Sequence, residues 1–562
     1  MFDREYGPKS RIERVPGSLS WLFAIGTWFH GPDHASGDER QLLELIQTVG
    51  VEQVTSELEG FFTLVFADGH NRQISVITDL SGGCHCYYRI FPEGIAFSSS
   101  SIVLAAMNGA ELDPVGTQEF LATGVIYEDR SLWKGVYKLG PAEITICAPG
   151  HKMRTETYWR FSSLQPERYD AATGAEAVMG ALQSAARRIS TRFKHPLCDL
   201  TGGYDSRATI AGFLAAGIPL NTTVSGPSAN ADVRISRRIA AEFNLPHRHV
   251  MEDWLPSFGG LETAFELTDG EYDSVEYSRI AAIHRDHASK FDISVNGSFG
   301  ELARAYWWEL LLPNLGATTP VNARMVATKR FAAVPYDPGP FRADSRINLI
   351  SHMTDIVRRA NTELVGFPNT MQMDHTYYTL RMQRWLGRIG SSTNQIWPCI
   401  SPFGLRSVLV PVLESRWDAR IRSLLIRTML ARYTPRLANI PLEHGYPAIP
   451  ATLWNIYRFW PVPLHYAKRA WSKFDRIAGI TRAKAQRLDL IDTLLRDDRI
   501  RDLTQFRRLK QIGFIEPDGI ENFGAQAQQA SFRWEEQWCR FLTVEYALMR
   551  TELAVRDDNF VA

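Results

Sequence analysis

The sequence predicts an α+β unit over residues 1–160, followed over residues 170–562 by an α/β unit with a parallel sheet and a helical C-terminal part. Before residue 160, short segments rich in β-branched and aromatic residues are separated by Gly, Asp, Asn and Pro, which is typical of strands. After residue 170, strands alternate with helices, which indicates a parallel sheet with helices on both faces. The length of 562 residues also exceeds one ordinary core.

The first unit is expected to be a layer of strands with a helix packed on it, ending near TETYWRFSS. The helix is predicted in DERQLLELIQTVGVEQVTSEL, where apolar residues group on one face (Leu42, Leu43, Leu45 and Ile46). The strands are predicted in SLSWLFAIGTWF, GFFTLVFAD, RQISVITD, CYYRIF, GIAFSSS and EITICA.

The second unit begins with a helix in AATGAEAVMGALQSAARRISTRF and a buried strand in PLCDL. The next helix, SRATIAGFLAAGIP, is stopped by Gly217 and Pro219. A strand, a helix and a strand then follow in LNTTVSG, ADVRISRRIAAEFNLP and HRHVM. After about residue 345 the sequence is mainly helical.

Composition excludes several classes of protein. Lys plus Arg and Asp plus Glu both number 62, so the chain lacks the basic excess of a general nucleic-acid binder. Six scattered cysteines favour reduced thiols, and Cys84-His85-Cys86 lacks a second ligand pair for zinc. Without a signal peptide or an apolar run of roughly 18 residues, we expect a cytoplasmic protein with no membrane span.

One stretch, CDLTGGYDSR, lies where a strand passes into a helix, the place where ligands bind in parallel sheets. Gly202 and Gly203 allow backbone amides to approach phosphate oxygens, and Thr201 and Ser206 add hydroxyl donors. The helix N-terminus favours an anion there, and Asp205 suits Mg²⁺ held beside phosphates. The alternative is a tight turn in which Asp205 or Ser206 caps the helix. The motifs GxxxxGK[ST] and GxGxxG after a strand are absent.

Thr-Gly-Gly-Tyr-Asp-Ser resembles the SGGxDS pyrophosphate loop of the asparagine-synthetase family. That family joins a glutaminase-like domain of the Ntn type to a PP-loop ATP pyrophosphatase domain. LEGFFTLVFADGHNRQISVITDLSGGCHCYY and the segments that begin at Leu112 and Val224 are similar to further family regions, in the same order. The resemblance therefore covers nearly the whole chain.

The resemblance implies that a carboxylate attacks the α-phosphate of ATP, pyrophosphate leaves, and an amine displaces AMP from the acyl-adenylate. It implies that Thr201, Gly202, Gly203 and Ser206 hold pyrophosphate and that Asp205 binds Mg²⁺. Leu200 and the strand end Val224, Ser225 and Gly226 would flank the adenosine. Asp232 suits either this site or the N-cap of its own helix, and we favour the cap.

Three departures from the family pattern stand out. The family's N-terminal cysteine nucleophile is replaced by Phe2, so glutaminase activity is expected to be absent. The family's metal-binding aspartate is replaced by Gly300, which leaves Glu301 either as a metal ligand from a shifted loop or as a partner of Arg304. The family's late lysine is missing from LANIPLEHGYP, where His444 or Arg436 would have to substitute.

The favoured function is an ATP- and Mg²⁺-dependent ligase that forms an amide bond without its own glutaminase. A small-molecule or peptide carboxylate would be the substrate, and ammonia or a substrate amine the nucleophile. The alternatives are a lasso-peptide-type macrolactam cyclase, uronate amidation, and an inactive scaffold or binding protein.

A further segment, LWNIYRFWPVPLHYAKRAWSKF from Leu453, sets aromatic residues among basic ones. It suits either a surface for a peptide or protein partner or the packing of a helical subdomain, and we favour packing.

Overall fold

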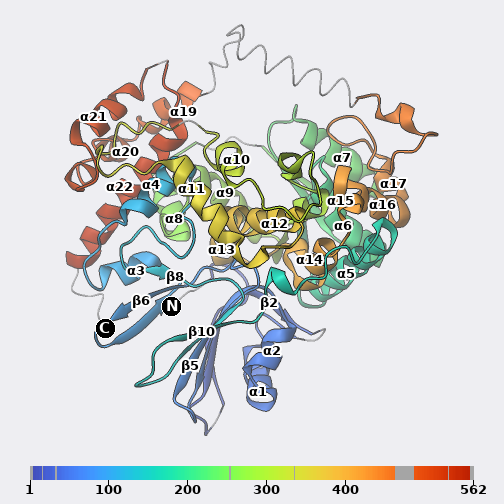
Figure 1. Ribbon diagram of the computed structural model, residues 1–562, viewed down its shortest axis with the longest axis horizontal. Coiled ribbons are helices and arrows are strands. Elements are labelled where there is room, and N and C mark those ends of the chain that lie inside the picture. Colours follow the sequence, from blue (N-terminus) through green and yellow to red (C-terminus); the bar gives the residue numbers. More distant parts are fainter. Residues whose placement is uncertain are drawn as a thin grey trace.

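The computed structural model describes residues 4–556 except for 16, 32–33, 252–254, 335, 462–486 and 530 (Figure 1). Its strands form a seven-stranded antiparallel sheet, a three-stranded antiparallel sheet and a five-stranded parallel sheet. Both antiparallel sheets come from the first 160 residues and the parallel sheet from residues after 195.

The seven-stranded sheet has the order β1-β2-β4-β5-β9-β10, with β3 paired to β2. Helices α1 (Glu39–Val49) and α2 (Val51–Glu57) pack on it, and Leu42, Leu43 and Ile46 join its core. The predicted single helix is thus two helices divided at Gly50. The strands are β1 (Ile12–Arg14), β2 (Trp21–His30), β3 (His34–Ala35), β4 (Leu58–Asp68), β5 (Gln73–Thr78), β9 (Glu143–Cys147) and β10 (Arg154–Thr157).

The three-stranded sheet has the order β7-β6-β8, formed by β6 (Tyr87–Phe91), β7 (Gly94–Ser98) and β8 (Tyr137–Lys138). With α3 (Ser101–Ala106) and α4 (Pro114–Thr123) it shares a hydrophobic core with helices from the end of the chain. In Figure 1 these late helices, in red, lie beside α3 and α4. Segments far apart in sequence therefore build one core, which brings residues 122–127 close to α22 (Glu535–Arg556).

The five-stranded sheet has the order β13-β12-β11-β14-β15, and every pairing in it is parallel. Its strands are β11 (Pro196–Asp199), β12 (Asn221–Ser225), β13 (His247–Val250), β14 (Ile293–Val295) and β15 (Cys399–Ile400). Helices α5 (Ala171–Arg192), α6 (Tyr204–Ala216) and α7 (Ala231–Phe243) alternate with the first strands, so the predicted βα pattern is confirmed. The strand order reverses between β11 and β14, which places the ligand-binding switch point there.

The described residues after 345 are mainly helical, as predicted. No helix in the described part of the chain combines the length and apolar character that a membrane span needs. The remaining α-helices are α8 (Phe258–Thr268), α9 (Ser274–Ala288), α10 (Ala323–Val326), α11 (Leu349–Ala360), α12 (Asn369–Thr376), α13 (Gly387–Ile396), α14 (Arg406–Leu413), α15 (Trp417–Arg420), α16 (Leu424–Tyr433), α17 (Pro435–Asn439), α19 (Arg487–Leu494), α20 (Asp498–Leu503) and α21 (Pro517–Gln526).

Candidate functional site

The loop between β11 and α6 is held closed by its own side chains. The Thr201 amide donates to Ser206 Oγ at 3.0 Å, and the Gly203 amide donates to Thr201 Oγ1 at 3.2 Å. The two hydroxyl oxygens lie 2.9 Å apart. Helix α6 begins at Tyr204 with Gly203 as its N-cap and no capping side chain, so the alternative in which Asp205 or Ser206 caps the helix is wrong.

Asp232 belongs to this loop rather than to its own helix end. Its Oδ1 accepts the Gly202 amide at 2.8 Å, while the N-cap of α7 is Asn230. Our preference for Asp232 as a cap is therefore wrong. Because Asp232 occupies the amide that an anion would bind, an arriving phosphate would have to displace its carboxylate.

The first turn of α6 meets the segment after β14 at the switch point. Asp205 Oδ2 accepts a hydrogen bond from Arg304 Nη2 at 2.5 Å. A Cβ atom on Gly300 would lie 2.8 Å from the Asp205 Cβ, and one on Gly297 would lie 2.7 Å from the Asp205 carbonyl carbon. Glycine at both positions is what allows this close approach, and an aspartate at position 300 would collide with Asp205.

The segment that carries Glu301 and Arg304 has strained backbone. Phe299, Ala305 and Trp307 have φ values of 68°, 56° and 69°, which L-residues other than Asn and Asp seldom adopt. Arg420 holds this segment in place, because its Nε donates to the Leu302 carbonyl at 3.0 Å. Strain of this kind persists only where surrounding contacts fix it, and it clusters at functional sites.

Arg420 is itself fixed by a buried acidic partner. Its Nη1 lies 2.6 Å from Asp374 Oδ2, and both side chains are almost fully buried. Trp308 Nε1 donates to the other Asp374 oxygen at 3.0 Å. This arrangement connects α12, α15 and the segment containing Glu301.

Two carboxyl groups at the site are electrostatically unusual. Burial and the neighbouring Asp205 carboxylate raise the pKa of Glu301 to about 7. Burial also raises the pKa of Asp205, although the Arg304 guanidinium opposes this shift. The alternative in which Glu301 pairs with Arg304 is not what the structure shows, since Arg304 makes its ion pair with Asp205.

These residues fit a hard cation such as Mg²⁺. Asp205 Oδ1 and Glu301 Oε2 are buried oxygens with no hydrogen-bond partner in the described part of the chain. Mg²⁺ takes one or two carboxylates and completes its octahedron with water and phosphate oxygens. No group of three or more His, Cys, Asp and Glu side chains that could hold a metal ion is found among the described residues.

A second loop, residues 437–446, lies against the first. Arg207 is buried and donates to the Ile440 carbonyl at 2.5 Å and to the Pro441 carbonyl at 3.2 Å. A Cβ atom on Gly202 would lie 3.4 Å from the Glu443 Cβ. His444 Nε2 is 3.2 Å from Glu443 Oε1, so the histidine lies on the loop next to the Gly-Gly turn.

Arg436, the other predicted substitute for the lysine, is directed elsewhere. Its guanidinium pairs with Glu242 at 2.8 Å and stacks on Phe243 at the end of α7. Of the two candidates, the structure brings only His444 to the loop.

Leu200, which follows β11, is buried, and its amide donates to the carbonyl of Thr223 on the neighbouring strand β12 at 2.9 Å. Val224 and Ser225 end the adjacent strand β12, and the Gly226 amide donates to the Val250 carbonyl at 3.0 Å. These predicted residues therefore lie on neighbouring strands at the same sheet edge as the loop.

Asp199, at the end of β11, is a titratable group that sequence reasoning missed. It lines a cavity of about 160 Å³ together with Phe61 and Gly83. Burial raises its pKa to about 7.

We expect Asp199→Asn to remove a pH dependence of stability. Because the folded pKa lies above the unfolded value, the favourable contribution of Asp199 is complete below about pH 4 and is lost as the pH rises through 7. Wild type should therefore lose about 2–3 kcal/mol relative to the variant between pH 5 and pH 8. Urea unfolding across this range measures the difference, and parallel stability curves for the two proteins would contradict it.

Burial disfavours the thiolate form of all six cysteines. All six are free, and burial raises the thiol pKa of each, to about 12 for Cys84, Cys86 and Cys399. A thiol with such a pKa is a poor nucleophile at neutral pH. Phe2 lies outside the described residues, so the absence of glutaminase activity stays a prediction.

The aromatic segment after Leu453 differs from our expectation where it is described. Trp454, Tyr457 and Trp460 are 92%, 74% and 68% exposed, so the packing interpretation is wrong for these three side chains. The remainder, including Tyr466 and Trp471, lies outside the described residues.

The molecule thus combines an α+β part built on antiparallel sheets with a parallel α/β part whose switch point carries a glycine-rich loop and a carboxylate cluster. Residues 33–159 match the family model described as a glutamine amidotransferase domain. No curated protein matches the chain. The first part is therefore a domain of glutamine amidotransferase type. Such a domain indicates an enzyme of amide formation or amide-nitrogen transfer.

Among solved structures, one described as the allosteric regulatory enzyme of purine biosynthesis matches with 10% sequence identity and a TM-score of 0.19. The match covers 43% of this chain and 62% of that one, so the chain spans less than two thirds of its length. A match this distant carries no argument for the fold or the activity.

Proposed function

We propose that the chain is an ATP-dependent ligase of asparagine-synthetase type, with a PP-loop in the parallel-sheet part, that activates a carboxylate as its acyl-adenylate. The observation that carries this proposal is the meeting of Asp205, Glu301 and Arg304 beside the Gly202-Gly203 turn. The unpaired oxygens of Asp205 and Glu301 and the Arg304 guanidinium lie at a switch point, where they suit a bound nucleoside triphosphate with its metal ion.

The reaction would proceed in two steps, adenylation of the carboxylate and then attack by the amine. A substrate carboxylate oxygen bonds to the α-phosphorus of ATP while the bond from that phosphorus to pyrophosphate breaks. An amine then bonds to the acyl carbon, AMP leaves with the carboxylate oxygen, and the amine loses a proton. Mg²⁺ held by Asp205 and Glu301 would neutralise charge on the phosphates.

The chain's own residues have defined tasks in this scheme. The first turn of α6 presents its uncapped amides to the pyrophosphate, and Ser206 and Thr201 exchange their mutual hydrogen bond for bonds to phosphate oxygens. Arg304 balances the Asp205 carboxylate and stabilises negative charge on the leaving group. His444 is a candidate proton carrier or cation on the adjacent loop.

Phe2, in place of the family's N-terminal cysteine, supports a nitrogen source other than glutamine hydrolysis, namely ammonia or a substrate amine. Lasso-type cyclisation and uronate amidation remain variants of the same chemistry. An inactive binding protein is the second candidate, favoured by one observation: Arg304 already neutralises one oxygen of Asp205.

The products of ATP decide between these functions. We expect incubation with ATP, Mg²⁺, ammonium and a panel of carboxylates to yield AMP and pyrophosphate in equal amounts, with one class of carboxylate giving most. Anion-exchange chromatography separates AMP from ADP. Formation of ADP, or of no product with any carboxylate, would refute the ligase.

A further inference from the structure

Arg427 lies at the junction of the two loops that build the site. It belongs to α16, which packs against α6 and against the segment Gly300–Arg304. Its Nε donates to the hydroxyl of Tyr204, the first residue of α6, at 2.9 Å. Its guanidinium carbon lies 5.8, 5.5 and 5.4 Å from the ring centres of Tyr204, Tyr446 and Phe459. Arg427 therefore contacts both the residue after the Gly-Gly turn and the end of the second loop.

The Arg427 side chain keeps most of its hydrogen-bonding capacity. A guanidinium carries five N–H donors. Within the described part of the chain, the bond to Tyr204 is the one hydrogen bond that Arg427 makes, and no carboxylate forms an ion pair with it. The three aromatic rings hold its charge in place without neutralising it. The residue is half-buried, so part of it stays accessible to a ligand.

The other arginines that contact the two loops are already engaged. Both Nη atoms of Arg207 donate to backbone carbonyls, at 2.5 and 3.2 Å. Arg304 pairs with Asp205, and Arg436 pairs with a carboxylate at the end of α7. Among these four arginines, as far as the chain is described, Arg427 alone keeps both its charge and its terminal donors for a ligand.

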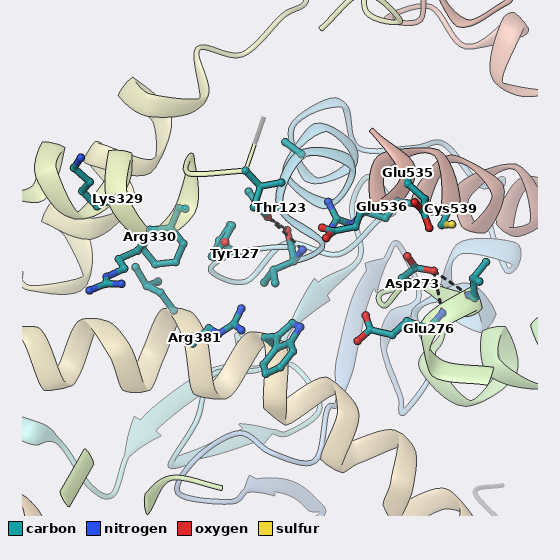
Figure 2. Close-up of a pocket in the computed structure, with 18 of the residues that line it drawn as sticks. Thr123, Tyr127, Asp273, Glu276, Lys329, Arg330, Arg381, Glu535, Glu536 and Cys539 are labelled. Carbon is teal, nitrogen blue, oxygen red and sulfur yellow. Dashed lines mark hydrogen bonds and ion pairs between the residues drawn. The ribbon is translucent and has the colours of Figure 1, made fainter. Parts of the chain in front are cut away.

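A cavity of about 680 Å³ holds its arginines in a different setting (Figure 2). Positive and negative side chains are interspersed on its walls, among them Asp273, Glu276, Arg279, Glu535, Glu536 and Arg540. Glu536 and Arg540 already form an ion pair at 3.0 Å. Because acids and bases are mixed there, the cavity indicates no single class of ligand, in contrast to the surroundings of Arg427.

The anion that suits Arg427 is a phosphate group. The two terminal nitrogens of an arginine donate side by side, which matches the spacing of phosphate oxygens. Tyr204 follows Gly203 directly, and the uncapped amides in the first turn of α6 favour an anion at the same place. The Arg304 guanidinium also lies over the Tyr204 ring, 5.7 Å from its centre, so two guanidiniums gather around this residue. A group with several phosphate oxygens, such as pyrophosphate, would meet the loop amides and Arg427 together.

We propose that Arg427 binds oxygens of the pyrophosphate part of a nucleoside triphosphate, and that Tyr204 positions the guanidinium for this contact. The inference rests on the proposed function and adds a ligand-binding cation to the same site. As the bond to the α-phosphorus breaks, negative charge grows on the leaving pyrophosphate, and Arg427 stabilises that charge.

Binding of pyrophosphate tests the contact without turnover. In calorimetric titrations with Mg²⁺, we expect Arg427→Gln to bind inorganic pyrophosphate and ATP about 10- to 100-fold more weakly than wild type, the usual cost of losing charge-assisted hydrogen bonds. AMP lacks the β- and γ-phosphates, so its affinity should stay unchanged. Arg432→Gln removes an exposed arginine of the same helix that pairs with Glu176. This control should bind all three ligands as wild type does.

The charge and the shape of the guanidinium are separated by Arg427→Lys. Lysine keeps the positive charge but not the paired donors, so this variant should bind pyrophosphate more tightly than Arg427→Gln and more weakly than wild type. Unchanged pyrophosphate affinity in Arg427→Gln would overturn the proposal, as would a wild type that binds no pyrophosphate. An equal loss of AMP affinity would show that Arg427 only shapes the loop, which would also overturn it.

Tyr204→Phe tests the positioning role, because it keeps the ring and removes the hydroxyl that holds Nε of Arg427. We expect pyrophosphate affinity to fall about 2- to 10-fold in this variant, and to fall no further when the change is added to Arg427→Gln. A full additional loss in the double variant would show that the hydroxyl acts independently of Arg427 and would refute the positioning role.

Binding and turnover distinguish the two proposals. Weaker pyrophosphate binding in Arg427→Gln, with no AMP formed by wild type from any carboxylate, would support the anion site while the ligase function fails. AMP formation by wild type, with unchanged pyrophosphate affinity in Arg427→Gln, would leave the ligase standing and overturn the inference about Arg427.

Discussion

Replacing Asp205 with Asn is expected to lower the rate of carboxylate-dependent pyrophosphate release by about 100- to 1000-fold, the usual cost of removing one electrostatic stabiliser of a transition state. The substitution keeps the shape of the side chain but removes the negative charge that Arg304 pairs with and that a cation would need. A coupled pyrophosphate assay at saturating ATP measures the effect.

A matched control for this variant is Asp498→Asn, which removes an aspartate from the first turn of the remote helix α20, where its side chain is 89% exposed. The control should retain wild-type rates. Wild-type rates in Asp205→Asn, with folding unchanged by circular dichroism, would show that this carboxylate has no part in the chemistry.

Replacing Asp374 with Ala is expected to destabilise the protein by about 3–5 kcal/mol, because it leaves the buried Arg420 guanidinium without a partner. Both side chains are at most 3% exposed, so water does not screen the unpaired charge. Urea unfolding measures the loss. The strained segment around Leu302, which Arg420 holds, should also become more susceptible to amide exchange.

Two further variants test whether the unpaired buried charge of Arg420 causes this loss of stability. Asp355→Ala breaks an exposed pair with Arg358 and should cost at most about 1 kcal/mol. The double variant Asp374→Leu and Arg420→Met removes both charges and should recover much of the lost stability. A double variant as unstable as Asp374→Ala would contradict the role of the unpaired charge.

The position of the glycine-rich loop in the fold could be predicted because its signal is local. Gly202, Gly203 and Asp205 lie between a recognisable strand and helix, and the alternation of strands and helices fixes which sheet edge they occupy. Glu301 could be placed near them only through the resemblance. Its position depends on how closely the segment after β14 approaches α6, which Gly297 and Gly300 permit.

The contacts that complete the site could not be predicted. The Asp205–Arg304 pair, the Asp232 contact with Gly202 and the Asp374–Arg420 pair join residues separated by 30 to 99 positions, and no spacing rule connects them. A cavity of about 680 Å³ was even less predictable, because the residues that line it lie between positions 122 and 540 of the sequence.

In the proposed reaction a carboxylate oxygen attacks the α-phosphate of ATP at this loop. Transfer of ¹⁸O from the carboxylate to AMP tests this attack most directly. The carboxylate that gives the most AMP is labelled with ¹⁸O and incubated with the protein, ATP, Mg²⁺ and ammonium, and the AMP is analysed by mass spectrometry. We expect AMP that carries one ¹⁸O atom. Unlabelled AMP, or ADP in its place, would contradict it.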